Sequence, residues 1–247
     1  MTSRRLAYLL SFCLGAFVVT ATALVRAETL SPDLNGLWMA VGRSPGEGSV
    51  QPIRFPTLPP YTELGQQRWD AYVAEFDPVV DDPAKFCVHP GMPGSMIGTP
   101  TFPMEMFHRP NDLTMMIEAY YQYRKIYIEG HDRPEPILPT RMGYSVGRWE
   151  GDVLVVETTH LSERTLGRIL MSEDARITER MRVVTDVNGN RLLVDDITFV
   201  DPQMYTAPIT MRGVWSHSPD TPIMEYVCSQ NIFDEYIENK RREAKAD

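Results

Sequence analysis

The sequence predicts an all-β fold: a closed antiparallel barrel with a long N-terminal loop and helix segment and a C-terminal helix. Residues 143–160 encode two strands around the tight turn Glu150-Gly151-Asp152. Further short runs rich in β-branched and aromatic residues follow through the second half of the chain. A meander of this length must protect its edges, and a barrel of about eight strands is the economical way to do so. A β-sandwich is the alternative.

Residues 1–27 are predicted to form a signal peptide. Arg4 and Arg5 precede an apolar run from Leu6 to Val25, and Ala27 ends a small-residue cleavage site. We therefore expect a periplasmic or secreted protein with no stable membrane insertion after signal cleavage. An uncleaved anchor is the alternative, because the run is long enough to span a bilayer.

The remaining chain fits one domain in three parts. Residues 28–103 are predicted to contain a first strand, a helix at 61–72 and a covering loop at 77–103 that is rich in Pro and Gly. Residues 104–230 are predicted to form the barrel meander, and residues 231–247 a C-terminal helix or tail. The predicted strands are Met104–Phe107, Leu113–Ile128, Tyr144–Trp149, Val153–His160, Ile177–Thr185, Leu192–Val200 and Ile209–Trp215.

Two cysteines, Cys87 and Cys228, follow the predicted signal peptide. An exported protein tends to pair an even number of cysteines, so we predict a Cys87–Cys228 disulfide that tethers the covering loop. Two separate buried thiols are the alternative.

Two sets of motifs resemble known proteins. Gly36-Leu37-Trp38 resembles the Gly-x-Trp opening of lipocalin-type barrels. The chain also contains Pro139-Thr140, Met142–Asp152, Leu154–Thr158, Arg124 with Ile126, Ile128, Glu129 and Gly130, Thr178–Arg180, Asp201-Pro202, Tyr205-Thr206 and Tyr226–Cys228. These motifs, over residues 84–230, resemble a large group of exported bacterial proteins of unknown function. The resemblance implies an exported, lipocalin-like domain without a known activity. His160 departs from it, because the group has a small or amide residue there.

Strand alternation selects a polar stripe that could bind a ligand. If Leu113–Arg124 is extended, Glu118, Tyr120 and Arg124 share one face, and Arg124 could hold a carboxylate through a bidentate pair. The alternative is a structural Arg–Glu pair at the end of the barrel. Met and aromatic residues nearby could line an apolar pocket. The predicted ligand-binding residues are Met116, Tyr120, Arg124, Tyr127 and Glu179.

His160 is the main candidate for acid–base chemistry. It follows Leu154, Val156 and Thr158 on one strand face, and a carboxylate such as Glu105 or Glu179 could assist it in moving protons. The predicted catalytic residues are His160, Glu105 and Glu118. A histidine that merely hydrogen-bonds a loop is the alternative.

Other chemistries find little support in the sequence. The histidines are scattered, so we predict no metal site, and we expect no cofactor. Gly143-Tyr144-Ser145-Val146-Gly147 matches a hydrolase elbow formally, but strand signals lie on both sides of it. The chain is acidic, with a net charge of −9, so a nucleic-acid partner is not expected.

We therefore predict a domain that binds a small hydrophobic molecule in a barrel cavity. The alternative is a cofactor-independent isomerase, hydratase, lyase or cyclase that acts on a small apolar substrate in the same cavity. A filled barrel with a structural role is the third possibility. The sequence identifies neither the ligand nor the oligomeric state.

Overall fold

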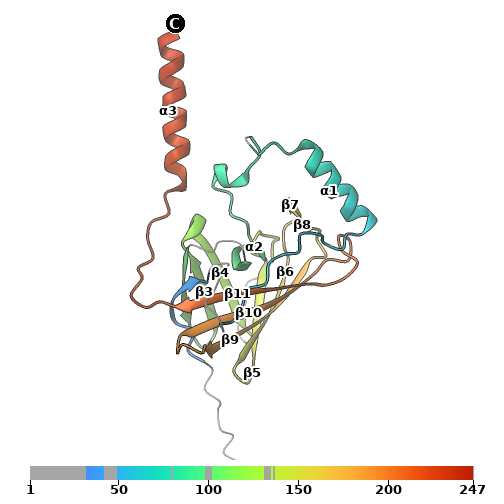
Figure 1. The fold of residues 1–247 in the computed structure, drawn as a ribbon, viewed down its shortest axis with the longest axis vertical. Coiled ribbons are helices and arrows are strands. Elements are labelled where there is room, and N and C mark those ends of the chain that lie inside the picture. Colours follow the sequence, from blue (N-terminus) through green and yellow to red (C-terminus); the bar gives the residue numbers. More distant parts are fainter. Residues whose placement is uncertain are drawn as a thin grey trace, which may run out of the picture.

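The computed structural model describes residues 32–41, 49–78, 80–97, 102–130, 135 and 137–246, so the predicted signal peptide lies outside the described residues. The described residues form a closed barrel (Figure 1), which confirms the predicted all-β class. Its strands are β1 (Gly36–Ala40), β2 (Pro103–His108), β3 (Asp112–Ile117), β4 (Gln122–Ile128), β5 (Tyr144–Glu150), β6 (Val153–Thr159), β9 (Arg176–Thr185), β10 (Arg191–Val200) and β11 (Ile209–His217).

One strand pair differs from the predicted antiparallel meander. The strand order around the barrel is β1-β11-β10-β9-β6-β5-β4-β3-β2, and β2 pairs with β1 to close it. A closed ring with an odd number of strands cannot alternate direction throughout, so at least one pair must be parallel. That pair is β4 with β5, over Ile126–Ile128 and Ser145–Gly147. The other neighbours in the ring are antiparallel.

The predicted strand Leu113–Ile128 is in fact two strands. The 3-10 helix η2 (Ala119–Tyr121) separates β3 from β4, and Tyr120 and Tyr121 adopt left-handed backbone angles, with φ of 61° and 50°. The turn restarts the alternation, so Arg124 lies opposite Met115 and faces inward with it. The predicted stripe of Glu118, Tyr120 and Arg124 on one face is therefore wrong.

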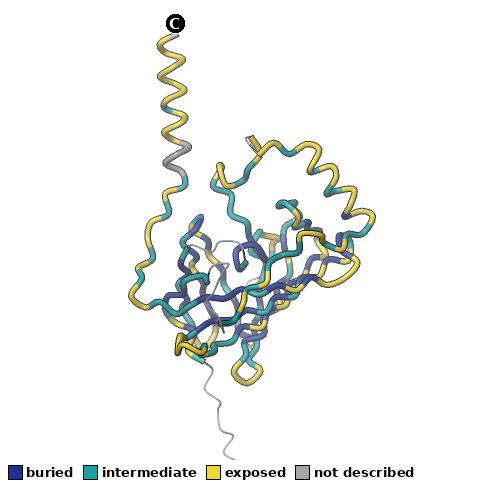
Figure 2. The backbone as a smooth tube through the Cα atoms, in the orientation of Figure 1, coloured by how far each residue is buried: buried dark blue, intermediate teal, exposed yellow. Residues whose placement is uncertain are grey.

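Large side chains fill the centre of the barrel. Trp38, Met115 and Phe199 are each 0% exposed, so they are packed on every side and leave no water-sized space beside them. Figure 2 shows the buried residues concentrated on the barrel strands. The other inward side chains of this core include Met104, Met106, Leu113, Ile117, Ile126, Leu154, Val156, Ile177, Met181, Leu193, Ile197 and Met211.

Short elements surround the end of the barrel at which β4 and β5 begin. The helix α1 (Glu63–Glu75) confirms the helix predicted at 61–72, and Thr62 caps it by accepting a hydrogen bond from the Gly65 amide. The hairpin of β7 (Arg164–Leu166) and β8 (Ile169–Met171) connects β6 to β9. Residues 80–97, called the covering segment below, contain the 3-10 helix η1 (Pro83–Phe86) and the short helix α2 (Gly94–Ile97).

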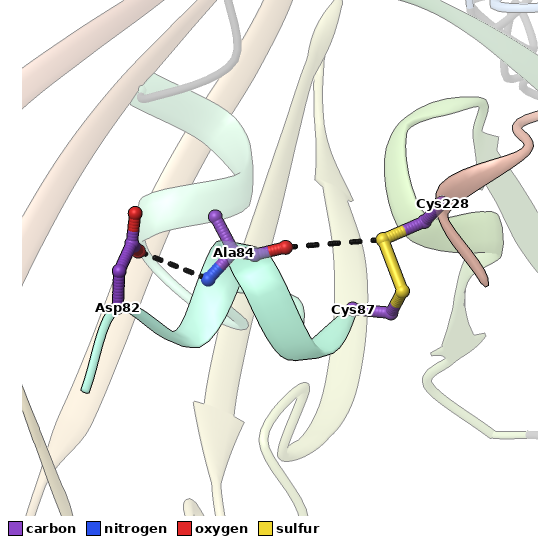
Figure 3. Close-up of a disulfide and its surroundings, with 4 residues drawn as sticks. All are labelled: Asp82, Ala84, Cys87 and Cys228. Atoms are coloured by element: carbon purple, nitrogen blue, oxygen red, sulfur yellow. Dashed lines mark hydrogen bonds between the residues drawn. A yellow bond between two sulfur atoms is a disulfide. The ribbon is translucent and has the colours of Figure 1, made fainter. Parts of the chain in front are cut away.

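The covering segment is held at two places. Towards its C-terminal end, Met92 and Met96 are buried in the barrel core. Near its middle, Cys87 forms the predicted disulfide with Cys228, with 5.7 Å between the Cα atoms (Figure 3). The cysteine pair fits an oxidising environment.

The disulfide also fixes the start of α3 (Cys228–Ala246), which contains the predicted C-terminal helix. Figure 1 shows α3 extending away from the barrel. Within the described part of the chain, no helix combines the length and the apolar character needed to cross a membrane.

Asp201 and Tyr205, which belong to the motifs quoted above, have structural roles. The Asp201 carboxylate accepts hydrogen bonds from the backbone and side chain of Ser172 and from the amides of Gln203 and Met204. The Tyr205 hydroxyl accepts a hydrogen bond from the Leu170 amide at 2.7 Å. These bonds join the turn after β10 to the region of β8.

Candidate functional site

A buried polar cluster lies inside the barrel around Arg124. Its guanidinium donates to both carboxylate oxygens of Glu179, at 2.8 Å from Nη1 to Oε1 and with a second, short bond from Nη2 to Oε2. Nη2 also donates to Thr158 Oγ1 at 2.9 Å and to Ser145 Oγ at 3.1 Å. Arg124 is 2% exposed and Glu179 is 0% exposed, so the ion pair is shielded from water.

The cluster arises because neighbouring strands each contribute an inward polar residue. Ser145 on β5 and Thr158 on β6 are register partners, and their hydroxyl oxygens lie 2.8 Å apart. Glu179 on β9 lies opposite Val156, which is the next inward position along β6. The guanidinium of Arg124 on β4 therefore spans β5 and β6 to reach β9.

Asp195 on β10 adds a second carboxyl group to the cluster. It is fully buried, and among the described groups no side chain or amide donates a hydrogen bond to either of its oxygens. Burial and the negative charge of Glu179 raise the pKa of Asp195 well above its usual value, although Arg124 opposes this shift. The shift favours the protonated form of Asp195, whose hydroxyl group can donate to Glu179. With Asp195 in that form, the cluster pairs Arg124 with one carboxylate and one neutral acid.

This arrangement identifies a structural role for the cluster. A buried ion pair with satisfied hydrogen bonds fixes the relative positions of the strands that supply it. It joins β4, β5, β6 and β9 in the wall of the barrel. The burial of Arg124 and Glu179 gives a ligand no direct route to either charge.

A hollow of about 460 Å³ lies in the barrel wall, where β4 and β5 separate. The two strands pair only over Ile126–Ile128 and Ser145–Gly147, so the start of β4 diverges from the chain that leads into β5. We call this hollow the wall pocket. It is lined by Tyr123, Arg124, Lys125, Tyr127, Ile137, Leu138, Thr140, Met142, Gly143 and Tyr144.

The lining of the wall pocket is mostly apolar and aromatic. Tyr127 and Tyr144 stack with ring centroids 5.5 Å apart, and the Lys125 ammonium lies 5.5 Å from the centre of the Tyr127 ring. Leu138 and Tyr123 are 71% and 56% exposed, so a ligand could reach them from solvent.

The structure distributes the predicted ligand-binding residues over four places. Tyr127 lines the wall pocket. Arg124 borders the same pocket, but its side chain is 1% exposed and turns into the barrel, where it pairs with Glu179. Met116 is exposed on the outer face, opposite Tyr123 in the register. Tyr120 lies elsewhere, with its ring 5.1 Å from that of Tyr226.

The predicted catalytic residues do not converge. His160 is exposed just beyond β6, with φ of 52°, so it does not continue the inward face of that strand. Its Nδ1 lies 2.8 Å from Thr159 Oγ1. Glu105 is on the outer face of β2, opposite Met116, and Glu118 accepts a hydrogen bond from the Met224 amide at 2.6 Å.

Sequence reasoning missed Asp195, Ser145 and Thr158 as members of the cluster. The sequence does indicate that Asp195 is buried. Alternate residues of a strand share a face, so Asp195 lies on the same buried face as Leu193 and Ile197. Ser145 was considered only as a hydrolase nucleophile. It is buried in the middle of the sheet and not at a strand-to-helix turn, which excludes the elbow geometry.

The comparisons with known proteins add no assignment. No protein-family model matches the chain, and no curated protein matches it either. Across the residues that the structure describes, no group of three or more His, Cys, Asp or Glu side chains is arranged to hold a metal ion.

Proposed function

We propose that the protein is an exported, lipocalin-like domain that binds a small hydrophobic molecule in the wall pocket. The observation that carries this proposal is the apolar hollow of about 460 Å³ beside β4, a volume typical of small-molecule sites. Because side chains fill the centre of the barrel, we place the ligand site in the wall pocket and not in the interior cavity expected from the sequence. The Cys87–Cys228 disulfide supports export, since disulfides persist mainly in oxidising compartments.

Two features of the wall pocket favour an apolar, planar or elongated ligand. The stacked rings of Tyr127 and Tyr144 form a rigid aromatic wall. Ile137, Leu138 and Met142 provide aliphatic surface, and methionine adapts to different shapes. Binding would cover the exposed side chain of Leu138, which would contribute favourable burial of apolar surface.

Leu138→Glu tests the proposal directly. Leu138 is 71% exposed, so the change places a charge in the pocket with little effect on folding. Titration with N-phenyl-1-naphthylamine, a neutral apolar fluorophore, should show binding by the wild type and at least about tenfold weaker binding by the variant, since burying a charge is costly. Val187→Glu is the matched control, because Val187 is 73% exposed in the β9–β10 turn. Equal affinity in Leu138→Glu and wild type would refute a wall-pocket site.

One observation favours the alternative, an acid–base enzyme acting on an apolar substrate. The ring of His160 makes an edge contact with Tyr144, at 6.2 Å between centroids, and Tyr144 lines the wall pocket. An imidazole at the pocket rim could exchange a proton with a bound substrate. His160→Ala should then abolish turnover of a bound compound while leaving its affinity nearly unchanged. Unchanged turnover in that variant would exclude this alternative.

A further inference from the structure

A second cluster of polar side chains lies where the covering segment meets the barrel. It consists of His89 from the covering segment, Arg141 from the chain before β5, and Arg164 from β7, and we call it the cationic cluster. Gly91 lies at its centre. A Cβ atom at this position would lie 2.9 Å from Arg164 Nη2 and 2.9 Å from Arg141 Cβ, so both arginines approach the same stretch of backbone.

Backbone contacts hold the cationic cluster together. The Met92 amide donates to the Arg141 carbonyl oxygen at 2.9 Å, and Arg164 Nη2 donates a short hydrogen bond to the Met92 carbonyl oxygen. Arg164 Nη1 also donates to the Ser162 carbonyl oxygen at 3.4 Å. The covering segment is thus bonded to both arginines.

The positive charge of the cationic cluster has no acidic partner among the described residues. Neither Arg141 nor Arg164 takes part in any of the ion pairs between described residues. Burial, together with the charge of Arg141, lowers the pKa of the Arg164 guanidinium to about 10. Burial and then the charges of Arg141 and Arg164 also lower the pKa of His89. Each shift reflects a partly desolvated site with an excess of positive charge.

Two buried nitrogen atoms in the cationic cluster are also unsatisfied. Arg164 Nε and His89 Nδ1 are inaccessible to solvent, and neither has a hydrogen-bond partner among the described atoms. Buried polar groups in folded proteins normally have a partner, and a buried donor without one costs free energy. An anionic acceptor would compensate the positive charge and accept a hydrogen bond from Arg164 Nε, and from His89 Nδ1 in the tautomer that carries the proton there.

We infer that the cationic cluster is a binding site for an oxyanion, the carboxylate or phosphate group of a small molecule. Arg141 and Arg164 supply guanidinium groups, which bind planar or tetrahedral oxyanions through paired hydrogen bonds. His89 supplies a third nitrogen from the covering segment. An anion held by all three would join the covering segment to the barrel, and the covering segment must shift locally to admit it. This inference does not depend on ligand binding in the wall pocket.

Isothermal titration calorimetry of the purified full chain with sodium phosphate and with sodium acetate tests the inference. Each titration is compared with a titration of sodium chloride at the same ionic strength. A difference between the two then reports specific binding and not general screening of charges by salt. We expect binding of at least one of the two anions with a millimolar Kd, and a Kd at least about tenfold higher in Arg141→Gln. Binding of phosphate alone would indicate a phosphate ester as the natural ligand, and binding of acetate would indicate a carboxylate.

Two further variants make the result decisive. Arg164→Gln should weaken binding as Arg141→Gln does, but it also removes the bond to the Met92 carbonyl and could impair folding. Arg141→Gln is the primary variant because its side chain forms no ion pair with another described residue. Arg180→Gln is the control, since Arg180 pairs with Glu150 on the outer surface. The absence of binding by the wild type, or binding that Arg141→Gln leaves unchanged, would overturn the inference.

Discussion

The two acids of the buried cluster, Glu179 and Asp195, lie beside the same arginine. Replacing both acids should therefore change the free energy of unfolding by more than the sum of the two single replacements. Arg124 carries one positive charge, and the raised pKa of Asp195 favours a single compensating carboxylate beside it. Asp195→Asn replaces a neutral acid with a neutral amide of the same shape. We expect it to raise the free energy of unfolding at pH 7, because the folded state no longer has to hold a proton that the unfolded state releases near pH 4.

The double variant should behave differently from either single variant. In Glu179→Gln, Asp195 can lose its proton and compensate Arg124, so the expected loss is about 2 kcal/mol for the bidentate hydrogen bonds. In Glu179→Gln/Asp195→Asn, Arg124 remains buried without any acid, and the expected loss is about 3–5 kcal/mol or more. Urea unfolding at pH 7, followed by tryptophan fluorescence, measures all three values. Additive changes would refute the idea that the two acids share one compensating role.

The same reasoning predicts the sign of a pH dependence. Because folding raises the pKa of Asp195, the native state holds a proton that the unfolded state loses near pH 4. The stabilisation is complete below that pH and is lost as the pH rises through the folded-state pKa. The free energy of unfolding should fall by up to about 1.4 kcal/mol per pH unit in this window, and Asp195→Asn should remove this part of the slope.

Asp196 provides a control with the opposite sign. It lies next to Asp195 but faces outward, where it pairs with Arg182 and Arg212. Burial would raise its pKa, but hydrogen bonds from the two arginines hold the pKa below the usual value. Its contribution is therefore present above the unfolded-state pKa and is lost as the pH falls through the folded-state pKa. The test compares the slope of the free energy of unfolding against pH in the neutral range. If Asp196→Asn changes this slope and Asp195→Asn does not, the slope does not arise from Asp195.

Two further predictions concern the covering elements. Gly65→Ala should destabilise the protein by about 1–3 kcal/mol, although alanine normally favours a helix, because its Cβ would lie 2.2 Å from the Met204 carbonyl oxygen. Urea unfolding checks this against Gln67→Ala on the exposed face of α1, and a stabilised Gly65→Ala would contradict the close packing. Cys87→Ser/Cys228→Ser opens a loop with a sequence separation of 141 residues and should cost roughly 2–5 kcal/mol. Limited proteolysis should then cut near α3 first, and equal resistance of α3 with and without the disulfide would argue against its tethering role.

Local sequence signals predicted most of the strands and turns. Glu150-Gly151-Asp152 marks the β5–β6 turn, in which Gly151 has a φ of 65°. The β9–β10 turn contains Asn188-Gly189, a dipeptide common in hairpin turns, and Gly189 has a φ of 84° there. These predictions succeed because a tight turn depends on the backbone preferences of a few adjacent residues. The disulfide could also be predicted, because only two cysteines follow the predicted signal peptide.

The candidate site was predicted only in part. Arg124 is predicted from a polar strand face and Glu179 as a carboxylate near His160, and the structure pairs the two with each other. Asp195 was missed although its alternation with Leu193 and Ile197 indicated burial. His160 was placed on the inward face by counting along β6, but its left-handed backbone ends that alternation. A single residue of positive φ is enough to redirect a side chain, and strand periodicity does not reveal it.

The sequence by itself determined the all-β class, the hairpins, the helices and the cysteine pair, because each depends on short-range preferences or on counting residues. Only the tertiary structure decided how the ring closes. An odd number of strands requires a parallel pair, which here is β4 with β5, and the wall pocket lies beside this pair. The turn at η2 reverses the face of β4, so Arg124 points into the barrel. Both outcomes depend on contacts between residues far apart in the sequence, which no local pattern specifies.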